Sequence, residues 1–202
     1  MGKTRLAAGA VCLCLLSDAC SPREVLTRRL AADLIAGSRA FRTPQQFWLR
    51  TGVVSNKDFL SPEYVVLQHS GWISGTSNRR CPAELSPPPC WDVVLTPLGV
   101  ETFRDLIHSS DADKQYFSVA TARRELVVIA GISRTGNMAD VDFIWKWKPL
   151  NEVGAALYAG DIQYSSTVRL KNYDDGWRLV QGVASKPNQD IEDALKNAEP
   201  VQ

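Results

Sequence analysis

The stretch ADVDFIWKWKP, from Ala139 to Pro149, decides the fold of the C-terminal half of this chain. Successive side chains of an extended strand point to opposite faces, so Phe143, Trp145 and Trp147 fall on one face and the intervening lysine falls on the other. The pattern therefore predicts a half-buried strand with an aromatic inner face.

The sequence around this strand predicts a sheet. Four segments are rich in β-branched and aromatic residues, namely 125–132, 141–148, 163–170 and 177–183. Asp174, Asp175 and Gly176 are typical of a hairpin turn, since Asp and Gly tolerate the positive φ angles that such turns need. The connections favour an antiparallel meander of four strands, and the longer connection 149–160 has room for one or two helical turns.

The first twenty residues have the composition of a secretory signal peptide. Two basic residues, Lys3 and Arg5, precede an apolar or small-residue run over 6–16, and Ala19 comes directly before Cys20. Such a run is too short to span a bilayer as a permanent helix. We expect the signal to be removed on export.

The residues around Cys20 resemble the bacterial lipoprotein signal, in which a cysteine after a small residue is lipidated and becomes the mature N-terminus. Ala19 and Cys20 match that signal. Ser17 and Asp18 depart from it, because leucine and a small uncharged residue are more common at these positions. The resemblance covers the first tenth of the chain and implies a cell-envelope protein anchored by lipid on Cys20. Ordinary cleavage near Ala19, giving a soluble periplasmic protein, is one alternative, and a cytosolic protein with an apolar N-terminal helix is another.

The balance of charges gives no reason to expect a nucleic-acid partner. The chain has 23 basic and 22 acidic residues, and the signal contains two of the former and one of the latter, so the mature protein has no formal net charge. Binding to nucleic acid depends on a basic surface that releases counterions. The partners that we expect are the membrane, through the lipid, and a protein of the envelope.

Cys81 and Cys90 remain once the signal and Cys20 are set aside. An exported protein meets an oxidising compartment, so we expect these two cysteines to form a disulfide that closes the loop PAELSPPP. A metal site is the alternative, but no Cys-x-x-Cys or paired histidine accompanies them. The sequence predicts neither a metal nor a cofactor.

Four helix starts in the N-terminal half share one pattern, in which a hydroxyl residue precedes proline: Ser21-Pro22, Thr43-Pro44, Ser61-Pro62 and Thr96-Pro97. The hydroxyl can accept a backbone N–H as the N-cap. Proline suits the first helical position, because a backbone N–H there has no partner within the helix and its loss costs nothing. The apolar residues and glycines that follow predict helices over 22–36, 44–51 and 62–70, with a fourth from residue 97.

The order helix, hairpin, helix, with its entry from Leu95 to Gly99, resembles the winged-helix arrangement of many bacterial DNA-binding proteins. An exported chain does not meet DNA, so this resemblance concerns the fold alone. The complete prediction is an α+β protein, in which a helical, winged-helix-like N-terminal half precedes the four-stranded antiparallel sheet. In outline it is similar to cystatin-like or NTF2-like folds.

Composition divides the chain into five parts. The run 109–114 is polar and lacks apolar periodicity, so it predicts a linker. The division that we expect is a signal peptide at 1–19, a helical region at 20–108, a linker and sheet entry at 109–124, a β-sheet domain at 125–185 and a polar tail at 186–202.

The residues that catalysis requires are scarce. The chain has two histidines, His69 and His108, each near the predicted end of a helix, and no Gly-x-Ser-x-Gly motif supplies an activated serine. Asp140 and Asp142 share a strand face and could be paired carboxylates, but the alternation favours a solvated outer face. These observations favour a protein without catalytic activity.

The aromatic face is the remaining candidate for a site, through Phe143, Trp145, Trp147 and Trp177. Such side chains could line a ligand pocket on a curved sheet, since pockets are largely apolar with a few polar groups. Alternating tryptophans on a strand more often form the core beneath a packed helix. The leading hypothesis is therefore a non-catalytic binding or assembly module of the bacterial cell envelope, and the alternative is a small-ligand or enzymatic pocket in this sheet.

Overall fold

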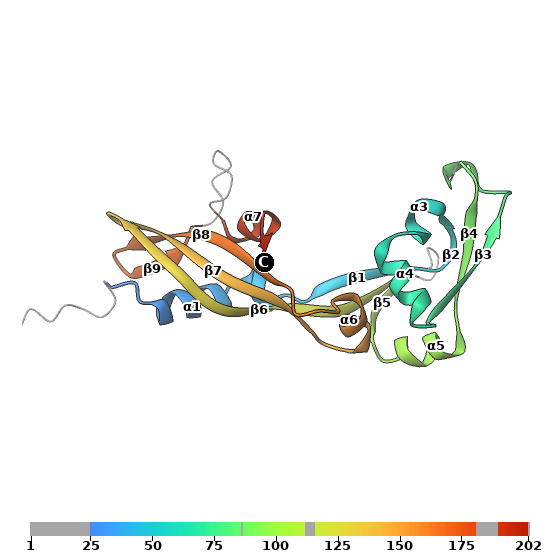
Figure 1. The fold of residues 1–202 in the computed structure, drawn as a ribbon, viewed down its shortest axis with the longest axis horizontal. Helices are drawn as coiled ribbons and strands as arrows, with labels where there is room; N and C mark the ends of the chain where they lie inside the picture. Colours follow the sequence, from blue (N-terminus) through green and yellow to red (C-terminus); the bar gives the residue numbers. More distant parts are fainter. Residues whose placement is uncertain (1–24, 86, 112–115, 181–189, 202) are drawn as a thin grey trace, which may run out of the picture.

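The computed structural model describes residues 25–85, 87–111, 116–180 and 190–201. Within them the chain forms a seven-stranded sheet and a separate three-stranded sheet, with short helices between the strands (Figure 1). The long strands β6, β7 and β8 lie in one half of an elongated molecule, and the small sheet stands at the other end (Figure 1).

The elements alternate between helices and strands throughout the chain. The first ten are α1 (Arg28–Ala36), α2 (Arg39–Arg42), β1 (Gln45–Arg50), β2 (Gly52–Ser55), α3 (Asn56–Phe59), α4 (Pro62–His69), β3 (Ile73–Asn78), the 3-10 helix η1 (Ala83–Leu85), β4 (Cys90–Leu95) and α5 (Pro97–Phe103). The others are β5 (Ile107–Asp111), β6 (Tyr116–Thr135), β7 (Met138–Pro149), α6 (Glu152–Leu157), β8 (Gln163–Tyr173), β9 (Gly176–Leu179), α7 (Ile191–Lys196) and β10 (Glu199–Pro200).

The large sheet has the order β1-β6-β7-β8-β10, with β5 also paired to β6 and β9 to β8. Strands β6, β7, β8 and β9 pair consecutively and antiparallel, which confirms the predicted meander. The turn between β8 and β9 is the predicted one, because Tyr173 pairs with Gly176, whose φ is 120°. The prediction of a four-stranded sheet is wrong, since β1, β5 and β10 are also members.

The prediction of a helical, winged-helix-like N-terminal half is also wrong. Residues expected to form its second helix are strand β1, and β2, β3 and β4 make the small sheet in the order β2-β4-β3. The N-cap pattern at Thr43-Pro44 is a local preference, whereas pairing with β6 hydrogen-bonds the whole strand and buries Leu49. The cystatin-like and NTF2-like outlines rested on the same division of the chain and fail with it.

Two of the predicted helix starts are confirmed. Ser61 Oγ accepts the backbone N–H of Tyr64 at the start of α4, and Thr96 Oγ1 accepts that of Gly99 at the start of α5. Helix α1 ends at Ala36 as predicted but begins later, after its N-cap Thr27. The first predicted start, at residues 21–22, lies outside the described residues.

Two hydrophobic cores share strand β6. The sheet core lies between the long strands and helices α1, α2 and α7, and its larger members are Ile35, Phe41, Ile129, Val141, Phe143, Trp145, Val168, Leu170, Trp177 and Leu195. The hairpin core joins β1 and β6 to the small sheet, and its buried members are Leu49, Val54, Phe59, Tyr64, Leu67, Trp72, Ile73, Val93, Phe103, Val119 and Val153. Val119 and Ile129 both belong to β6, so one strand runs through both cores.

Helix α6 occupies the connection between β7 and β8, where one or two helical turns were expected. Asn151 Oδ1 accepts the N–H of Gly154, and Asn151 Nδ2 donates to the backbone oxygen of Ala120 on β6. A Cβ atom at Gly154 would lie 1.8 Å from the backbone oxygen of Thr121. Glycine is therefore required for the helix to approach β6 so closely.

Strand β6 and helix α7 occupy segments that were expected to be a linker and a tail. Residues 109–124 contain the end of β5 and the first part of β6. Within the expected tail, α7 inserts Ala194 and Leu195 into the sheet core, and β10 pairs with β8. These two contacts hold α7 against the large sheet, where the start of the helix lines a cavity.

Candidate functional site

A cavity of about 610 Å³ lies beside the sheet core. Its walls come from α2, the start of β1, the middle of β6, the end of β9 and the start of α7. Segments from both halves of the sequence therefore meet at this place. The described residues that line it include charged groups of both signs, Arg39 and Arg124 with Asp190 and Glu192.

Arg124 is the central side chain of the cavity wall. On β6 it stands opposite Trp147 of β7, and its Cζ lies 4.9 Å from the Trp147 ring centroid and 5.6 Å from that of Trp145. Its Nη1 donates to the backbone oxygen of Ala40 at 2.8 Å. Its Nε is buried and has no hydrogen-bond partner among the described residues. The guanidinium is thus held in place by Ala40 and the two rings, while its buried Nε has no partner.

The Arg124 charge lies partly out of water. Burial lowers the pKa of the Arg124 guanidinium from its ordinary value, and the negative charge of Glu192 acts in the opposite direction. An arginine side chain remains protonated in proteins despite such shifts. A partly desolvated cation is costly without an anionic partner, so this position favours a negatively charged group in the cavity.

Ser38 supplies a second unused polar atom. It connects α1 to α2 and stands at the N-cap position of α2, but its side chain caps no helix N–H. Its Oγ is buried without a hydrogen-bond partner in the part of the chain that the structure describes. Ser38 and Arg124 line the same cavity, so two residues of its lining each have a buried polar atom without a partner.

The acidic residues of the lining belong to the start of α7. Asp190 is the N-cap of this helix, and its Oδ1 accepts the N–H of Asp193 at 2.8 Å. Glu192 is exposed and forms no ion pair with Arg124 within the 4.0 Å limit for such pairs, although the two charges interact. Arg124 and Glu192 therefore line the same cavity as opposite charges without forming an ion pair.

A second hollow, of about 470 Å³, lies on the other side of α2. Arg124 lines it as well, together with Arg42, Arg123 and Asp33. Its described lining lacks the buried unpaired serine of the first cavity. For this reason we take the first cavity, here called the Arg124 cavity, as the candidate site.

The structure places most of the predicted aromatic site in a filled core. Phe143, Trp145 and Trp177 are 0%, 2% and 4% exposed. Trp145 is fixed further, because its Nε1 donates to Ser166 Oγ at 3.0 Å and its ring stacks on Tyr164 at 4.8 Å. These contacts use the aromatic face for packing.

Trp147 differs from the other three aromatic residues. It is half-buried, its ring lies against Arg124, and it borders a small cavity of about 90 Å³ together with Tyr158. Trp147 therefore links the predicted aromatic face to the Arg124 cavity, and it is the member of the predicted set that lies nearest to the candidate site.

Sequence reasoning missed Arg124 and Ser38. The doublet Arg123-Arg124 has the composition of an exposed strand entry, and Ser38 has the composition of a loop. The signal that could have been used is alternation. Arg124 and Leu126 fall on the same face of β6 as the aromatic face of β7, because they pair with Trp147 and Trp145.

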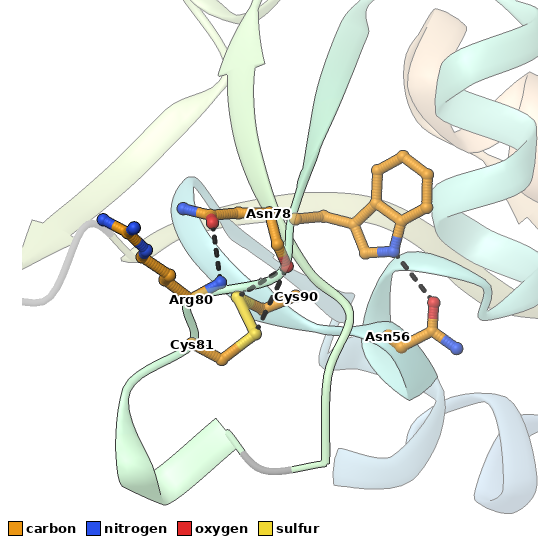
Figure 2. The surroundings of a disulfide bond; sticks show 6 residues. Asn56, Asn78, Arg80, Cys81 and Cys90 are labelled. Atoms are coloured by element: carbon orange, nitrogen blue, oxygen red, sulfur yellow. Dashed lines mark hydrogen bonds between the residues drawn. A yellow bond between two sulfur atoms is a disulfide. The ribbon is translucent and has the colours of Figure 1, made fainter.

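The predicted disulfide between Cys81 and Cys90 is confirmed, with the two Cα atoms 5.7 Å apart. It closes the end of the β3–β4 hairpin, and its sulfur atoms lie 3.4 and 3.6 Å from the Asn78 backbone oxygen (Figure 2). Trp91 follows Cys90 in the sequence, and its Nε1 donates to Asn56 Oδ1 at 2.9 Å. The disulfide thus fixes a hairpin in the small sheet, far in sequence from the Arg124 cavity.

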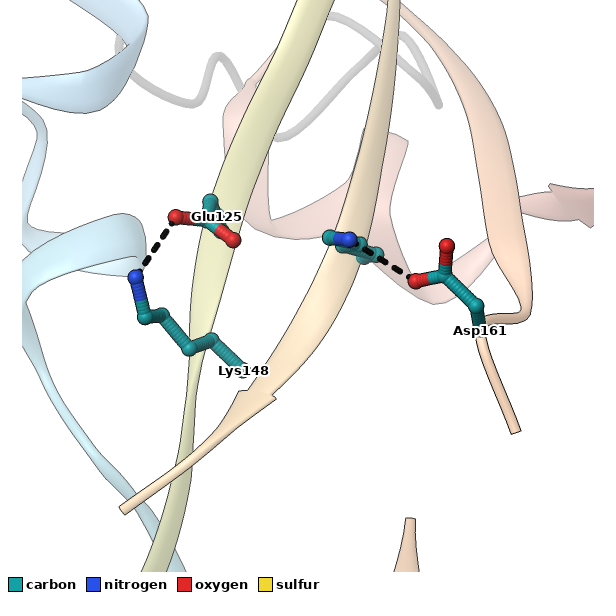
Figure 3. A network of polar contacts seen from close by, with 4 residues as sticks. Glu125, Lys148 and Asp161 are labelled. Carbon is teal, nitrogen blue, oxygen red and sulfur yellow. Dashed lines mark hydrogen bonds and ion pairs between the residues drawn. The ribbon is translucent and has the colours of Figure 1, made fainter. Parts of the chain in front are cut away.

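The outer face of the large sheet carries ion pairs. Figure 3 shows Lys148 with Glu125, 2.9 Å apart, and Asp161 with its own lysine partner, Lys146, at 2.8 Å. Asp140, once a candidate paired carboxylate, binds Arg169 through two hydrogen bonds of 2.6 and 3.1 Å. Asp142 instead accepts from Thr167 Oγ1, so these two carboxylates have separate partners.

The described residues contain no group of three or more His, Cys, Asp and Glu side chains that could hold a metal ion. No helix in the same residues is long and apolar enough to cross a membrane. Cys20, the predicted lipidation site, lies outside the described part of the chain.

Comparison with known proteins finds no match for this chain among protein families, curated proteins or solved structures.

Proposed function

We propose that this protein is a non-catalytic binding module of the bacterial cell envelope, which is held at the membrane by lipid on Cys20 and takes a ligand into the Arg124 cavity. The supporting observation is that Ser38 and Arg124 line one cavity and that each has a buried side-chain atom, Oγ and Nε, without a hydrogen-bond partner in the described structure. A buried donor without a partner costs about 1 to 3 kcal/mol, and more when it is charged. A ligand with acceptor oxygens would remove this cost.

The position of Arg124 supports a binding role because the side chain is held in place before any ligand arrives. It extends from the long strand β6 and is fixed by Ala40 and by two tryptophan rings. Binding to a preorganised group loses less conformational entropy than binding to a mobile one. The cavity is therefore suited to recognition of a small group or of one end of a larger molecule.

The proposed location in the cell envelope is based on the lipoprotein-type signal. It is consistent with the Cys81–Cys90 disulfide, since disulfides persist in oxidising compartments. We expect Cys20→Ala to abolish incorporation of a fatty-acid label and to release the protein from membranes. Cys81→Ser, which also removes one cysteine but leaves the signal intact, is the matched control. Unchanged membrane fractionation of Cys20→Ala would refute the anchor.

Photo-crosslinking tests whether the cavity binds a molecule in the envelope. A benzophenone amino acid replaces Arg39 on the cavity rim or, as a control, the exposed Glu101 on α5 at the other end of the molecule. We expect an adduct from position 39 that is absent from position 101 and is lost when Arg124→Gln is added. The mass of the adduct distinguishes a small ligand from a protein partner. Equal adducts from both positions, or none from either, would contradict the proposal.

A further inference from the structure

A group of exposed arginines borders the second hollow, the one of about 470 Å³. Its lining includes Arg42 of α2 and Arg123 of β6. Both side chains are exposed, and neither forms an ion pair within 4.0 Å among the described residues. Exposed cations without an internal partner are open to an anionic surface outside the protein.

Helix α1 extends this group with a third arginine, Arg29. Asp33 and Ala36 of α1 line the same hollow. Residues three or four apart on a helix share a face, so Arg29 precedes Asp33 by one turn on the face that borders the hollow. Arg29 is exposed and has no ion pair within the described structure. We call Arg29, Arg42 and Arg123 the basic surface.

The acidic residues beside the basic surface do not cancel its charge. Asp33 and Glu125 both line the hollow. Glu125 lies 2.9 Å from Lys148, so a lysine already neutralises it (Figure 3). Asp33 is then the one acid of the described lining to set against three arginines. The whole chain has a formal net charge of +1, so these arginines concentrate positive charge at one place.

The basic surface lies close in sequence to the proposed lipid. Thr27, the N-cap of α1, follows Cys20 by seven residues, and a chain of that length spans at most about 25 Å. The start of α1 is held against β6, because Arg28 Nη2 donates to the Ala130 backbone oxygen at 3.4 Å. Helix α1 lies along the large sheet, away from the small sheet (Figure 1). A lipid on Cys20 would therefore keep the basic surface near the headgroups of the bilayer.

We infer that the basic surface of Arg29, Arg42 and Arg123 contacts the anionic lipid headgroups of the membrane that holds the protein. The inference goes beyond ligand binding in the Arg124 cavity and rests on the proposed anchor, since the lipid brings this surface to the membrane. Each basic residue near an anionic membrane strengthens binding about fivefold. The lipid thus holds the protein at the bilayer, and the three arginines select the face that is turned toward it.

Vesicle sedimentation tests the basic surface in the absence of the lipid anchor. The protein is the mature chain from residue 20 with Cys20→Ala, which keeps every described residue. The probes are vesicles of phosphatidylcholine alone and vesicles of phosphatidylcholine and phosphatidylglycerol in equal parts. We expect the protein to sediment with the anionic vesicles and not with the neutral ones, and to dissociate when added salt screens the charges.

Single substitutions assign the contact to the basic surface. Arg29→Gln, Arg42→Gln and Arg123→Gln should each raise the lipid concentration that binds half of the protein by about fivefold. Arg79→Gln also removes one exposed arginine, but from the hairpin of the small sheet, so it is the matched control with unchanged binding.

Asp33→Asn gives a prediction of the opposite sign. It removes the acid that opposes the three arginines, so binding to the anionic vesicles should become tighter by a similar factor of about five. A substitution that only disturbed the fold would not produce this gain.

The outcomes that overturn the inference are distinct from those that overturn the proposed function. Equal sedimentation with both kinds of vesicle, sedimentation with neither, or a loss in Arg79→Gln as large as in Arg42→Gln would refute the membrane contact. Fatty-acid labelling of Cys20 and crosslinking from position 39 would still decide the anchor and the cavity independently. Binding to anionic vesicles by a protein that takes up no fatty-acid label would support the basic surface and refute the anchor.

Discussion

The sheet core and the hairpin core share strand β6 but are closed in different ways. In the hairpin core, aromatic rings complete the packing, with Phe59 stacked on Trp91 at 4.2 Å and Trp72 edge-on to Phe103 at 6.1 Å. A disulfide then closes the end of the hairpin. In the sheet core, the rings of Trp145 and Trp147 lie instead beside the charged guanidinium of Arg124.

The difference shows that the hairpin core is satisfied by its own contacts, whereas the edge of the sheet core contains groups that lower the stability of the fold. Apolar contacts and the disulfide make the hairpin core a scaffold. At the edge of the sheet core, a partly desolvated guanidinium and a buried hydroxyl lack partners within the described structure. Such groups destabilise the protein alone and are relieved by a ligand, so we place the proposed site beside the sheet core.

The largest expected effect tests whether the two cores are separable. Phe143 in the sheet core and Phe103 in the hairpin core are both fully buried. We expect Phe143→Ala and Phe103→Ala each to lower the free energy of unfolding by about 3 to 5 kcal/mol. Because β6 runs through both cores, tryptophan fluorescence and circular dichroism should report a single coincident transition in urea for each variant. Two separate transitions would show that the cores unfold independently.

The disulfide should have the next largest effect, and it belongs to the hairpin core alone. Replacement of both cysteines, Cys81→Ala with Cys90→Ala, should lower the free energy of unfolding by about 2 to 3 kcal/mol, because an open loop gains entropy in the unfolded chain. Urea denaturation with and without a reductant provides the measurement. The reductant should destabilise the wild type and leave the double variant unchanged, and an unresponsive wild type would contradict the prediction.

Tyr64 of the hairpin core should make stability depend on pH at the alkaline end. Its hydroxyl donates to the backbone oxygen of Arg50 at 2.8 Å and accepts the Arg50 N–H at 2.9 Å. Burial raises the pKa of Tyr64 above its ordinary value. The folded protein therefore holds this proton more tightly than the unfolded chain, so its stability is complete below about pH 10 and falls as pH rises beyond it.

Tyr64→Phe checks this assignment. Loss of the hydroxyl should lower the free energy of unfolding by about 1 kcal/mol at neutral pH, and it should reduce the alkaline fall in stability. Urea midpoints between about pH 8 and pH 11 measure both effects. Burial also raises the pKa of Tyr158, so part of the fall should remain in the variant. An unchanged pH profile would show that Tyr64 is not the group responsible.

The smallest effect is expected on the outer face of the large sheet, which belongs to neither core. The side chains of Asp140 and Arg169 are 44% and 35% exposed, so water screens their ion pair. Asp140→Ala should change the free energy of unfolding by less than about 1 kcal/mol. A loss as large as that of the disulfide, measured by the same urea denaturation, would show that water does not screen this ion pair.

Several elements could be predicted because their causes are local. Alternation in the stretch from Ala139 to Pro149 identified β7 and its apolar face, and the N-caps Ser61 and Thr96 identified α4 and α5. The disulfide followed from the count of cysteines. Strand β1 could not be predicted. The local pattern at residues 43–44 favours a helix start, whereas the strand depends on pairing with β6, which lies about seventy residues away.

The candidate site was the least predictable part of the molecule. By itself the sequence determined which side chains share a strand face, since that depends on backbone geometry within a few residues. Tertiary structure alone decided that Arg124 stands opposite Trp147, that Ser38 Oγ is buried, and that Ser38, Arg124 and Glu192 line one cavity. The physical reason is that pairing register and the burial of polar groups depend on contacts between distant segments, which no local pattern records.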